Sequence, residues 1–147
     1  MKISVASDHA GYELKEAVKG HLTAAGHEVV DFGTNSTEST DYPDYAAPAA
    51  RAVASGEVEK GVFVCGSGQG MVMTANKVRG VRAALAWQPE VARLSRQHND
   101  ANVLALPARF IAIEQALEIV DAWLDAEFEG GRHVSRVDKM MKTEEGK

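Results

Sequence analysis

The sequence predicts an α/β domain built on a five-stranded parallel sheet. Short apolar runs rich in valine, alanine and leucine alternate along the chain with longer segments whose apolar residues recur at helical spacing. Glycine or proline stands at several of the boundaries between the two kinds of segment. Alternation of this kind builds βαβ units with right-handed crossovers, in which helices cover both faces of a parallel sheet.

Five segments are predicted as strands because they are short and apolar, and several are partly β-branched. In chain order they are Lys2–Ala6, Glu28–Phe32, Gly61–Cys65, Val81–Ala86 and Asn102–Leu106. For a small doubly wound sheet we expect the strand order 2-1-3-4-5. This order places the point where the chain switches direction between the first and third strands, and ligands of open α/β sheets bind there.

Helices are predicted between the strands and after the last one. They are Tyr12–Ala25, Ala46–Ser55, a segment from Met71 to near Arg79, Gln88–His98, Phe110–Ala126 and a final tail over Arg132–Lys142. The helix after the last strand is strongly periodic, since Ile113, Val120 and Trp123 fall on one face. Residues 1–147 are expected to form a single domain, with residues 130–147 as a tail that follows the break at Gly130 and Gly131.

Two loops with reactive side chains follow the strands at the switch point. Asp8 and His9 leave the first strand, and Cys65 opens the glycine-rich turn 66–70 after the third strand. Glycines let the backbone approach a ligand closely, and the free N–H groups of a helix start favour an anion and a thiolate. The non-functional alternatives are a solvated turn at Asp8 and His9 and a tight turn that holds an inert, buried cysteine. Tyr42, after the second strand, either lines the same edge or packs under its own loop.

Nucleotide and nucleic-acid binding are disfavoured. The turn has the spacing G-x-G-x-G, it follows the third strand, and no acidic residue stands where a ribose-binding acid is expected. A G-x-x-x-x-G-K-[ST] motif is absent from the sequence. The net charge of −5 argues against a nucleic-acid partner. One cysteine, no signal-peptide pattern and no long apolar run predict a cytoplasmic protein without a membrane contact.

Further polar residues that are candidates for a site lie outside these two loops. His98 and Asn99 end a helix, so they are expected at the amino edge of the sheet, away from the switch point. They form either an ordinary helix C-terminus or part of a second subunit's site. Arg132 and Arg136 share one face of the tail and are either solvated or a phosphate clamp for a partner subunit. Arg109 follows the last strand and is either a site residue or a surface charge.

The combined motifs resemble the ribose-5-phosphate isomerase type B family, which includes the galactose-6-phosphate isomerase subunits. The resemblance runs nearly end to end and rests on segments 7–11, 40–43, 65–70, 75–77, 94–100 and 130–133. It implies a Rossmann-like three-layer fold and a homodimer or dimer of dimers with composite interface sites. It also implies metal-free, cofactor-free interconversion of an aldose phosphate and a ketose phosphate.

The resemblance also implies a role for each matching residue. Cys65 is similar to the base that moves a proton between C1 and C2, and His98 to the acid that assists opening of the sugar ring. The amides of Gly66, Ser67, Gly68, Gln69 and Gly70 match an oxyanion hole. Asp8 and Asn99 match ligands of sugar hydroxyls. His9, Arg132 and Arg136 match phosphate ligands, with Arg109 close by.

Two departures and two alternatives bear on this reading. Ser67 stands where many members have threonine, and Met71 stands where one branch has a catalytic glutamate, which leaves Cys65 as the base. The same chemistry on a hexose 6-phosphate or a tetrose phosphate is the first alternative. A non-catalytic anion-binding module is the second.

Overall fold

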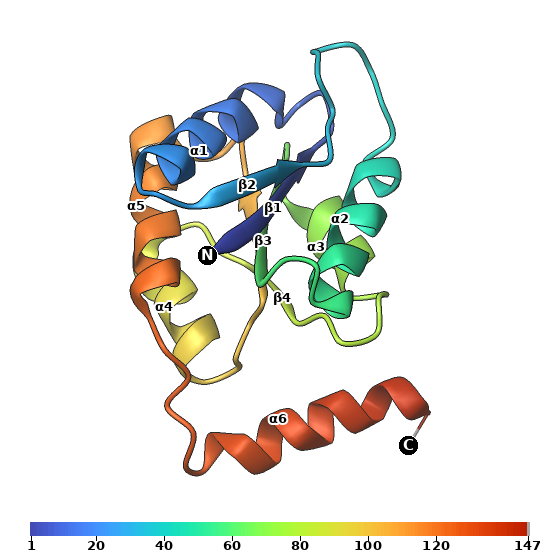
Figure 1. Ribbon diagram of the computed structural model, residues 1–147, viewed down its shortest axis with the longest axis vertical. Coiled ribbons are helices and arrows are strands. Elements are labelled where there is room, and N and C mark those ends of the chain that lie inside the picture. Colours follow the sequence, from blue (N-terminus) through green and yellow to red (C-terminus); the bar gives the residue numbers. More distant parts are fainter. Residues whose placement is uncertain (147) are drawn as a thin grey trace.

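The fold is a three-layer α/β sandwich, as predicted (Figure 1). The computed structural model describes residues 1–146, and Lys147, the last residue of the expected tail, lies outside the described residues. The strands are β1 (Lys2–Ser7), β2 (Glu28–Asp31), β3 (Lys60–Cys65), β4 (Ala83–Leu85) and β5 (Val103–Pro107). The helices are α1 (Tyr12–Ala24), α2 (Pro43–Ser55), α3 (Gln69–Ala75), α4 (Pro89–Gln97), α5 (Ile113–Asp125) and α6 (His133–Lys142), followed by the 3₁₀ turn η1 (Thr143–Glu145).

All the strand pairings of the sheet are parallel, but the predicted order of the last two strands is wrong. The order is β2-β1-β3-β5-β4, not 2-1-3-4-5. Every residue of β5 is buried, whereas the three residues of β4 are only partly buried. A central parallel strand must be apolar on both faces, so β5 takes the inner place beside β3 and the short β4 takes the edge. The switch point between β1 and β3 is unaffected.

The two faces of the sheet bury separate cores. Helices α1, α4 and α5 cover one face, where Val62 and Val64 of β3 point. Helices α2 and α3 cover the other face, where Phe63 and Cys65 point. This alternation follows from the two-residue period of a strand. It places the sulfur of Cys65 on the α3 side, next to the turn that starts α3.

Helix α6 lies beyond the amino end of the sheet, apart from the two helical layers that cover its faces (Figure 1). Within α6 only His133 and Val137 are buried. The turn η1 that follows α6 is held to the main body by a hydrogen bond of 2.8 Å from the Gly80 amide to Glu144 Oε1. No helix of the described residues has the length and apolar character that crossing a membrane requires.

A buried ion pair fixes the end of β2. Lys15 of α1 is fully buried, and its Nζ donates to both carboxylate oxygens of Asp31 at 2.8 Å. Burial by itself raises the pKa of Asp31, but the hydrogen bonds from Lys15 and Lys19 outweigh it and hold that pKa below its usual value. Asp31 Oδ1 also accepts the Gly33 amide hydrogen at 2.8 Å. The chain after β2 therefore leaves the sheet in a defined direction, toward the loop that carries Tyr42.

Helix α1 begins in direct contact with the backbone of β3. A Cβ atom at Gly11 would lie 2.3 Å from the carbonyl oxygen of Val64, which is closer than real Cβ contacts come. The Gly11 amide also donates to the side chain of Asp8 at 3.0 Å. Glycine at this position therefore lets the loop after β1 lie against the end of β3.

Substituting Gly11→Ala should destabilise the fold by about 3 kcal/mol, because the added methyl group meets backbone rather than a movable side chain. Urea unfolding of the purified variant measures this. Gly20→Ala is the matched control: a Cβ at Gly20 meets no atom of the described chain within 4 Å, and alanine favours the interior of α1 by about 1 kcal/mol. Equal stability of Gly11→Ala and the natural chain would contradict the assigned contact.

Candidate active site

The loops at the carboxyl edge of the sheet enclose a cavity of about 510 Å³. Nine of the fourteen predicted site residues line it: Asp8, His9, Tyr42, Cys65, Gly66, Ser67, Gln69, Gly70 and Arg109. Met73 and Phe110, which the sequence analysis did not single out, also line it. The prediction that the loops after β1 and β3 meet at one site is therefore confirmed.

Cys65 is the last residue of β3 and lines the cavity, and only 5% of the residue is exposed to solvent. The turn that follows is held from the other side by β5, since the amides of Ala108 and Arg109 donate to the carbonyls of Cys65 and Gly66 at 2.9 Å. These bonds fix the position of the thiol relative to the turn. Cys65 is thus a rigidly placed group at the wall of a cavity.

The glycine turn presents unused backbone donors. Gly68 adopts the left-handed conformation with φ of 78°, and a Cβ there would lie 2.4 Å from Leu85 Cδ1. Gly68 itself does not line the cavity. Among the hydrogen bonds within residues 1–146, none uses the amide hydrogens of Gly66, Ser67, Gly68 or Gly70. Donors at such a turn, next to a helix start, can bind an anionic oxygen.

Side chains close the cavity over the glycines. A Cβ at Gly66 would lie 3.1 Å from Arg109 Nη1, so this guanidinium rests on Gly66. A Cβ at Gly70 would lie 2.7 Å from the ring of Tyr42, so that ring rests on Gly70. Because neither glycine has a side chain, the guanidinium of Arg109 and the ring of Tyr42 can both pack against the turn and line the cavity.

The loop after β1 offers one acid and one imidazole. Asp8 is 8% exposed, and its Oδ1 accepts the Gly11 amide hydrogen. His9 Nδ1 accepts the Thr40 amide hydrogen at 3.1 Å. Because Nδ1 is the acceptor, Nε2 carries the proton of the neutral ring and is free to donate to a ligand. The pair is held in place and is not a solvated turn.

The four remaining predicted residues do not reach this cavity. His98 follows the last residue of α4, and Asn99 comes next, so both lie where the chain returns to the amino edge of the sheet. Arg132 and Arg136 are exposed at the start of α6, beyond that same edge (Figure 1). Their expected placement far from the switch point of their own chain is confirmed.

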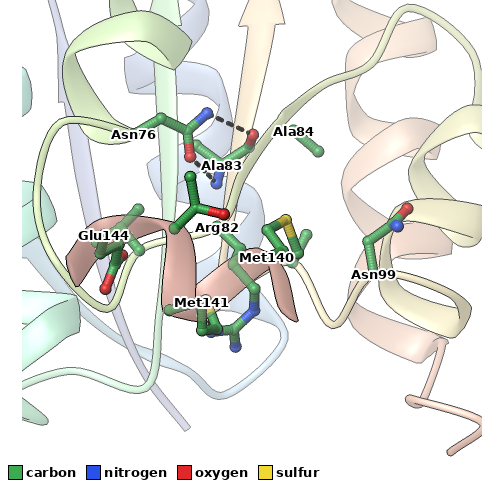
Figure 2. A pocket seen from close by; sticks show the side chains of 11 residues that line it. Asn76, Arg82, Ala83, Ala84, Asn99, Met140, Met141 and Glu144 are labelled. Atoms are coloured by element: carbon green, nitrogen blue, oxygen red, sulfur yellow. Dashed lines mark hydrogen bonds between the residues drawn. The ribbon is translucent and has the colours of Figure 1, made fainter. Parts of the chain in front are cut away.

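Asn99 lines a second cavity, of about 580 Å³, at the amino edge of the sheet (Figure 2). Its walls include Arg82 and, from α6, Met140 and Met141. Asn76 lies at the far wall, where its side-chain amide exchanges hydrogen bonds with the backbone of Ala83 at 2.8 and 3.0 Å. This cavity has no acid, base or thiol of the predicted catalytic set, so the reactive groups concentrate at the first cavity and at His98.

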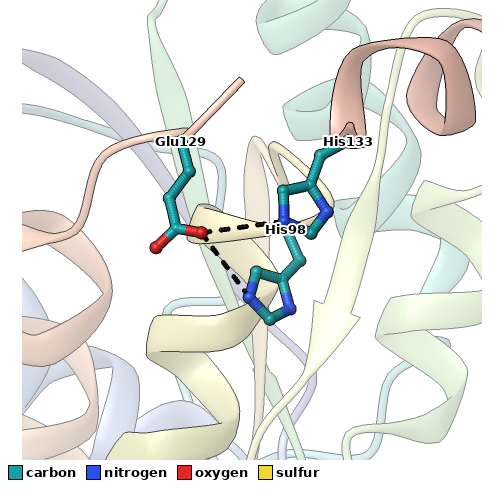
Figure 3. A group of neighbouring side chains, drawn as sticks. All are labelled: His98, Glu129 and His133. Atoms are coloured by element: carbon teal, nitrogen blue, oxygen red, sulfur yellow. Dashed lines mark ion pairs between the residues drawn. The ribbon is translucent and has the colours of Figure 1, made fainter. Parts of the chain in front are cut away.

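His98 belongs to a cluster that the sequence analysis missed (Figure 3). Its ring stacks on the ring of His133, with centroids 4.4 Å apart and planes 12° from parallel. Glu129 Oε1 lies 3.7 Å from His98 Nε2 and 3.6 Å from His133 Nε2. In the sequence, Glu129 and His133 stand on either side of Gly130 and Gly131, and this was the signal that could have indicated a cluster. Their approach to His98 depends on the positive φ values of the two glycines, which the sequence does not show.

The same three residues have the composition of a metal site, since one ligand atom of each lies within 4.8 Å of the others. Imidazole binds a metal along the lone pair in its ring plane, at about 2.0–2.1 Å for zinc. In two nearly parallel, stacked rings these directions do not converge on one point. The arrangement therefore does not favour binding of an ion, and the carboxylate lies at ion-pair distance from both imidazoles.

Comparison with known proteins identifies the type of molecule. Residues 3–140 match the family model described as Ribose/Galactose Isomerase. Ribose-5-phosphate isomerase B of Escherichia coli is 50% identical over 144 residues, which cover 98% of this chain and 97% of that protein. D-erythrulose-4-phosphate isomerase of Pectobacterium atrosepticum is 41% identical, with coverage of 95% and 93%. The crystal structure of ribose-5-phosphate isomerase B from Mycoplasma genitalium with bound ribulose-5-phosphate superposes with a TM-score of 0.95 at 43% identity, and covers 99% and 97% of the two chains.

The buried histidine of the cluster predicts a pH dependence of stability. Burial lowers the pKa of His133 below its ordinary value of 6.5, and the charges of His98 and Arg132 act in the same direction. The fold therefore binds this proton more weakly than the unfolded chain does. The contribution to stability is complete above about pH 6.5 and is lost as the pH falls below it. Urea unfolding at pH 7.5 and at pH 5.5 measures how much the free energy of unfolding falls between these pH values. The fall should be smaller in His133→Asn than in the natural chain, and an equal fall in both would contradict this.

Proposed function

The chain belongs to the ribose/galactose isomerase family and is a sugar-phosphate isomerase, and from this premise we propose that it interconverts ribose 5-phosphate and ribulose 5-phosphate. The observation that carries the proposal is the cavity in which Cys65, Asp8, His9 and the glycine turn meet. A related enzyme of the same fold binds ribulose-5-phosphate, which supports a five-carbon substrate. Family membership also removes the alternative of a non-catalytic module.

The chemistry of the proposal is a proton transfer between neighbouring carbons. The Cys65 thiolate removes the proton from C2 of the open-chain aldose, which leaves an enediolate. The same thiol returns a proton to C1, while a proton moves from the oxygen on C2 to the oxygen on C1. Free amides of the turn at Gly66, Ser67 and Gly70, which line the cavity, stabilise the negative oxygen, an effect worth about 3–4 kcal/mol per donor. The buried position of Cys65 keeps water away from the intermediate.

The other groups of the proposal come from a second copy of the chain. His98, Asn99, Arg132 and Arg136 lie beyond the opposite edge of the sheet from their own cavity, so they serve the cavity of a partner subunit. There His98 donates a proton that assists ring opening, and Asn99 joins Asp8 in binding sugar hydroxyls. The guanidinium groups of Arg132 and Arg136 suit a phosphate geometrically and electrostatically, together with His9. Arg109, on Gly66, adds a positive charge at the cavity wall.

A tetrose phosphate is the second candidate substrate. One relative, 41% identical over nearly its whole length, is a D-erythrulose-4-phosphate isomerase. The proton transfer is the same for both substrates, and only the distance from the reacting carbons to the phosphate differs.

Turnover of defined sugar phosphates by the purified chain in the presence of EDTA tests the proposal. Ribose 5-phosphate should give the highest kcat/KM among ribose 5-phosphate, erythrose 4-phosphate, allose 6-phosphate and galactose 6-phosphate. The expected independence of EDTA follows from a base that is a thiolate and from donors that are backbone amides. Preference for another sugar would overturn the assigned substrate but retain the chemistry, and loss of activity in EDTA would overturn the metal-free mechanism.

Mixing two inactive variants tests the shared site. Cys65→Ser and His98→Asn should each lose most activity as homodimers, because every site then has one defect. After joint refolding, about half of the dimers are mixed and each mixed dimer has one intact site, so about a quarter of the natural activity should return. Cys65→Ser mixed with the double variant Cys65→Ser/His98→Asn is the control and should stay inactive. If both groups acted within one chain, neither mixture would recover activity.

A further inference from the structure

Glu129 is the acidic member of the histidine cluster at the amino edge of the sheet (Figure 3). Its Oε1 stands at nearly equal distances from the two imidazole nitrogens, 3.7 Å from His98 and 3.6 Å from His133. Glu129 is half exposed and reaches no residue of the cavity at the carboxyl edge. Its side chain is therefore placed to act on the histidines rather than on groups of its own chain's cavity.

The backbone places Glu129 independently of its side chain. The Glu129 amide donates to the carbonyl of Gln97 at 3.0 Å, which ties the segment after α5 to the end of α4. Gly130 and Gly131 then take positive φ values of 69° and 56° and reverse the chain. This reversal sets His133 over His98 in the stacked arrangement. A change of the carboxylate to an amide leaves all of these backbone features intact.

The carboxylate of Glu129 faces both imidazoles, and the two rings differ in their exposure. His133 has 5% exposure, and burial together with the neighbouring His98 and Arg132 lowers its pKa. His98 is more exposed, with 37% of its side chain accessible. Glu129 Oε1 therefore lies within ion-pair distance of both the more accessible His98 and the buried His133.

The other charged groups around the pair do not replace this carboxylate. Arg132 and Arg136 of α6 are cations that oppose protonation of His133. On the α4 side, Asp100 is engaged by two arginines, with Arg96 Nη1 at 2.9 Å and Arg82 Nη2 at 3.4 Å. Among the described residues, Glu129 is thus the acidic side chain that lies within ion-pair distance of His98, at 3.7 Å.

We propose that Glu129 is a positioning residue whose carboxylate faces the positive charge that His98 carries when it acts as the acid in the partner subunit's site. The inference rests on the proposed function, in which His98 is the acid. Glu129 does not touch the substrate and acts through His98. A general acid that loses its balancing carboxylate gives up its proton at lower pH, so the variant loses activity on the alkaline side first.

The test is the pH profile of kcat/KM for ribose 5-phosphate in the natural enzyme and in Glu129→Gln. The alkaline limb should move down by about half a pH unit, the size expected for a partly exposed ion pair. Activity at the acidic end of the profile should change little. Glu127→Gln is the matched control, because Glu127 lies in the same linker and makes no ion pair within residues 1–146.

The outcomes separate this inference from the proposed function. An alkaline limb at the same pH in Glu129→Gln and the natural enzyme would overturn it, and so would a uniform loss of activity at every pH, which indicates a merely structural role. A shift of the same size in Glu127→Gln would also overturn it. If His98→Asn kept normal activity, the role of His98 and this inference would both fail. If His98→Asn were inactive and Glu129→Gln had an unchanged profile, only this inference would fail.

Discussion

The close contact between Gly11 and the carbonyl of Val64 is the constraint on which the site depends. It brings the first turn of α1 against β3, and so brings Asp8 and His9 beside Cys65 and the glycine turn. The same helix carries Lys15, whose buried pair with Asp31 directs the chain after β2 toward Tyr42. Three loops from three strands therefore meet because one helix start is packed without a side chain between it and the sheet.

The parallel topology also explains why one chain holds two separate sets of polar groups. Loops after strands gather at the carboxyl edge, where the cavity lies. Loops after helices gather at the amino edge, where α4 ends at His98 and the linker leads into α6. No rearrangement within such a sheet moves a group from one edge to the other. A mechanism that uses both sets accordingly needs two copies of the chain facing each other.

The sequence predicted most of the fold and the cavity, because both follow from local pattern and from the rule that ligands bind at the carboxyl edge. It failed where a choice depended on tertiary packing. The order of β4 and β5 depends on which strand is buried on both faces, and Ala83–Leu85, only three residues long, is partly buried. Lys15 is buried because Asp31 lies opposite it, which spacing along α1 does not reveal. Glu129 and His133 became neighbours of His98 through two left-handed glycines and a stacking contact, and neither has a periodic signature.

The proposed division of labour has a consequence for substrate length. In the proposed mechanism the glycine turn and Cys65 act on C1 and C2, which every aldose phosphate shares. The arginines that suit the phosphate lie on α6 and belong, in the proposed dimer, to the partner. The distance between the two is set by how subunits pack, so small changes in packing select a different sugar while the turn stays the same. Enzymes named for ribose 5-phosphate and for D-erythrulose 4-phosphate are both relatives of this chain, which fits such a mechanism of divergence. In the proposed dimer, selectivity is then a property of the interface more than of the catalytic residues.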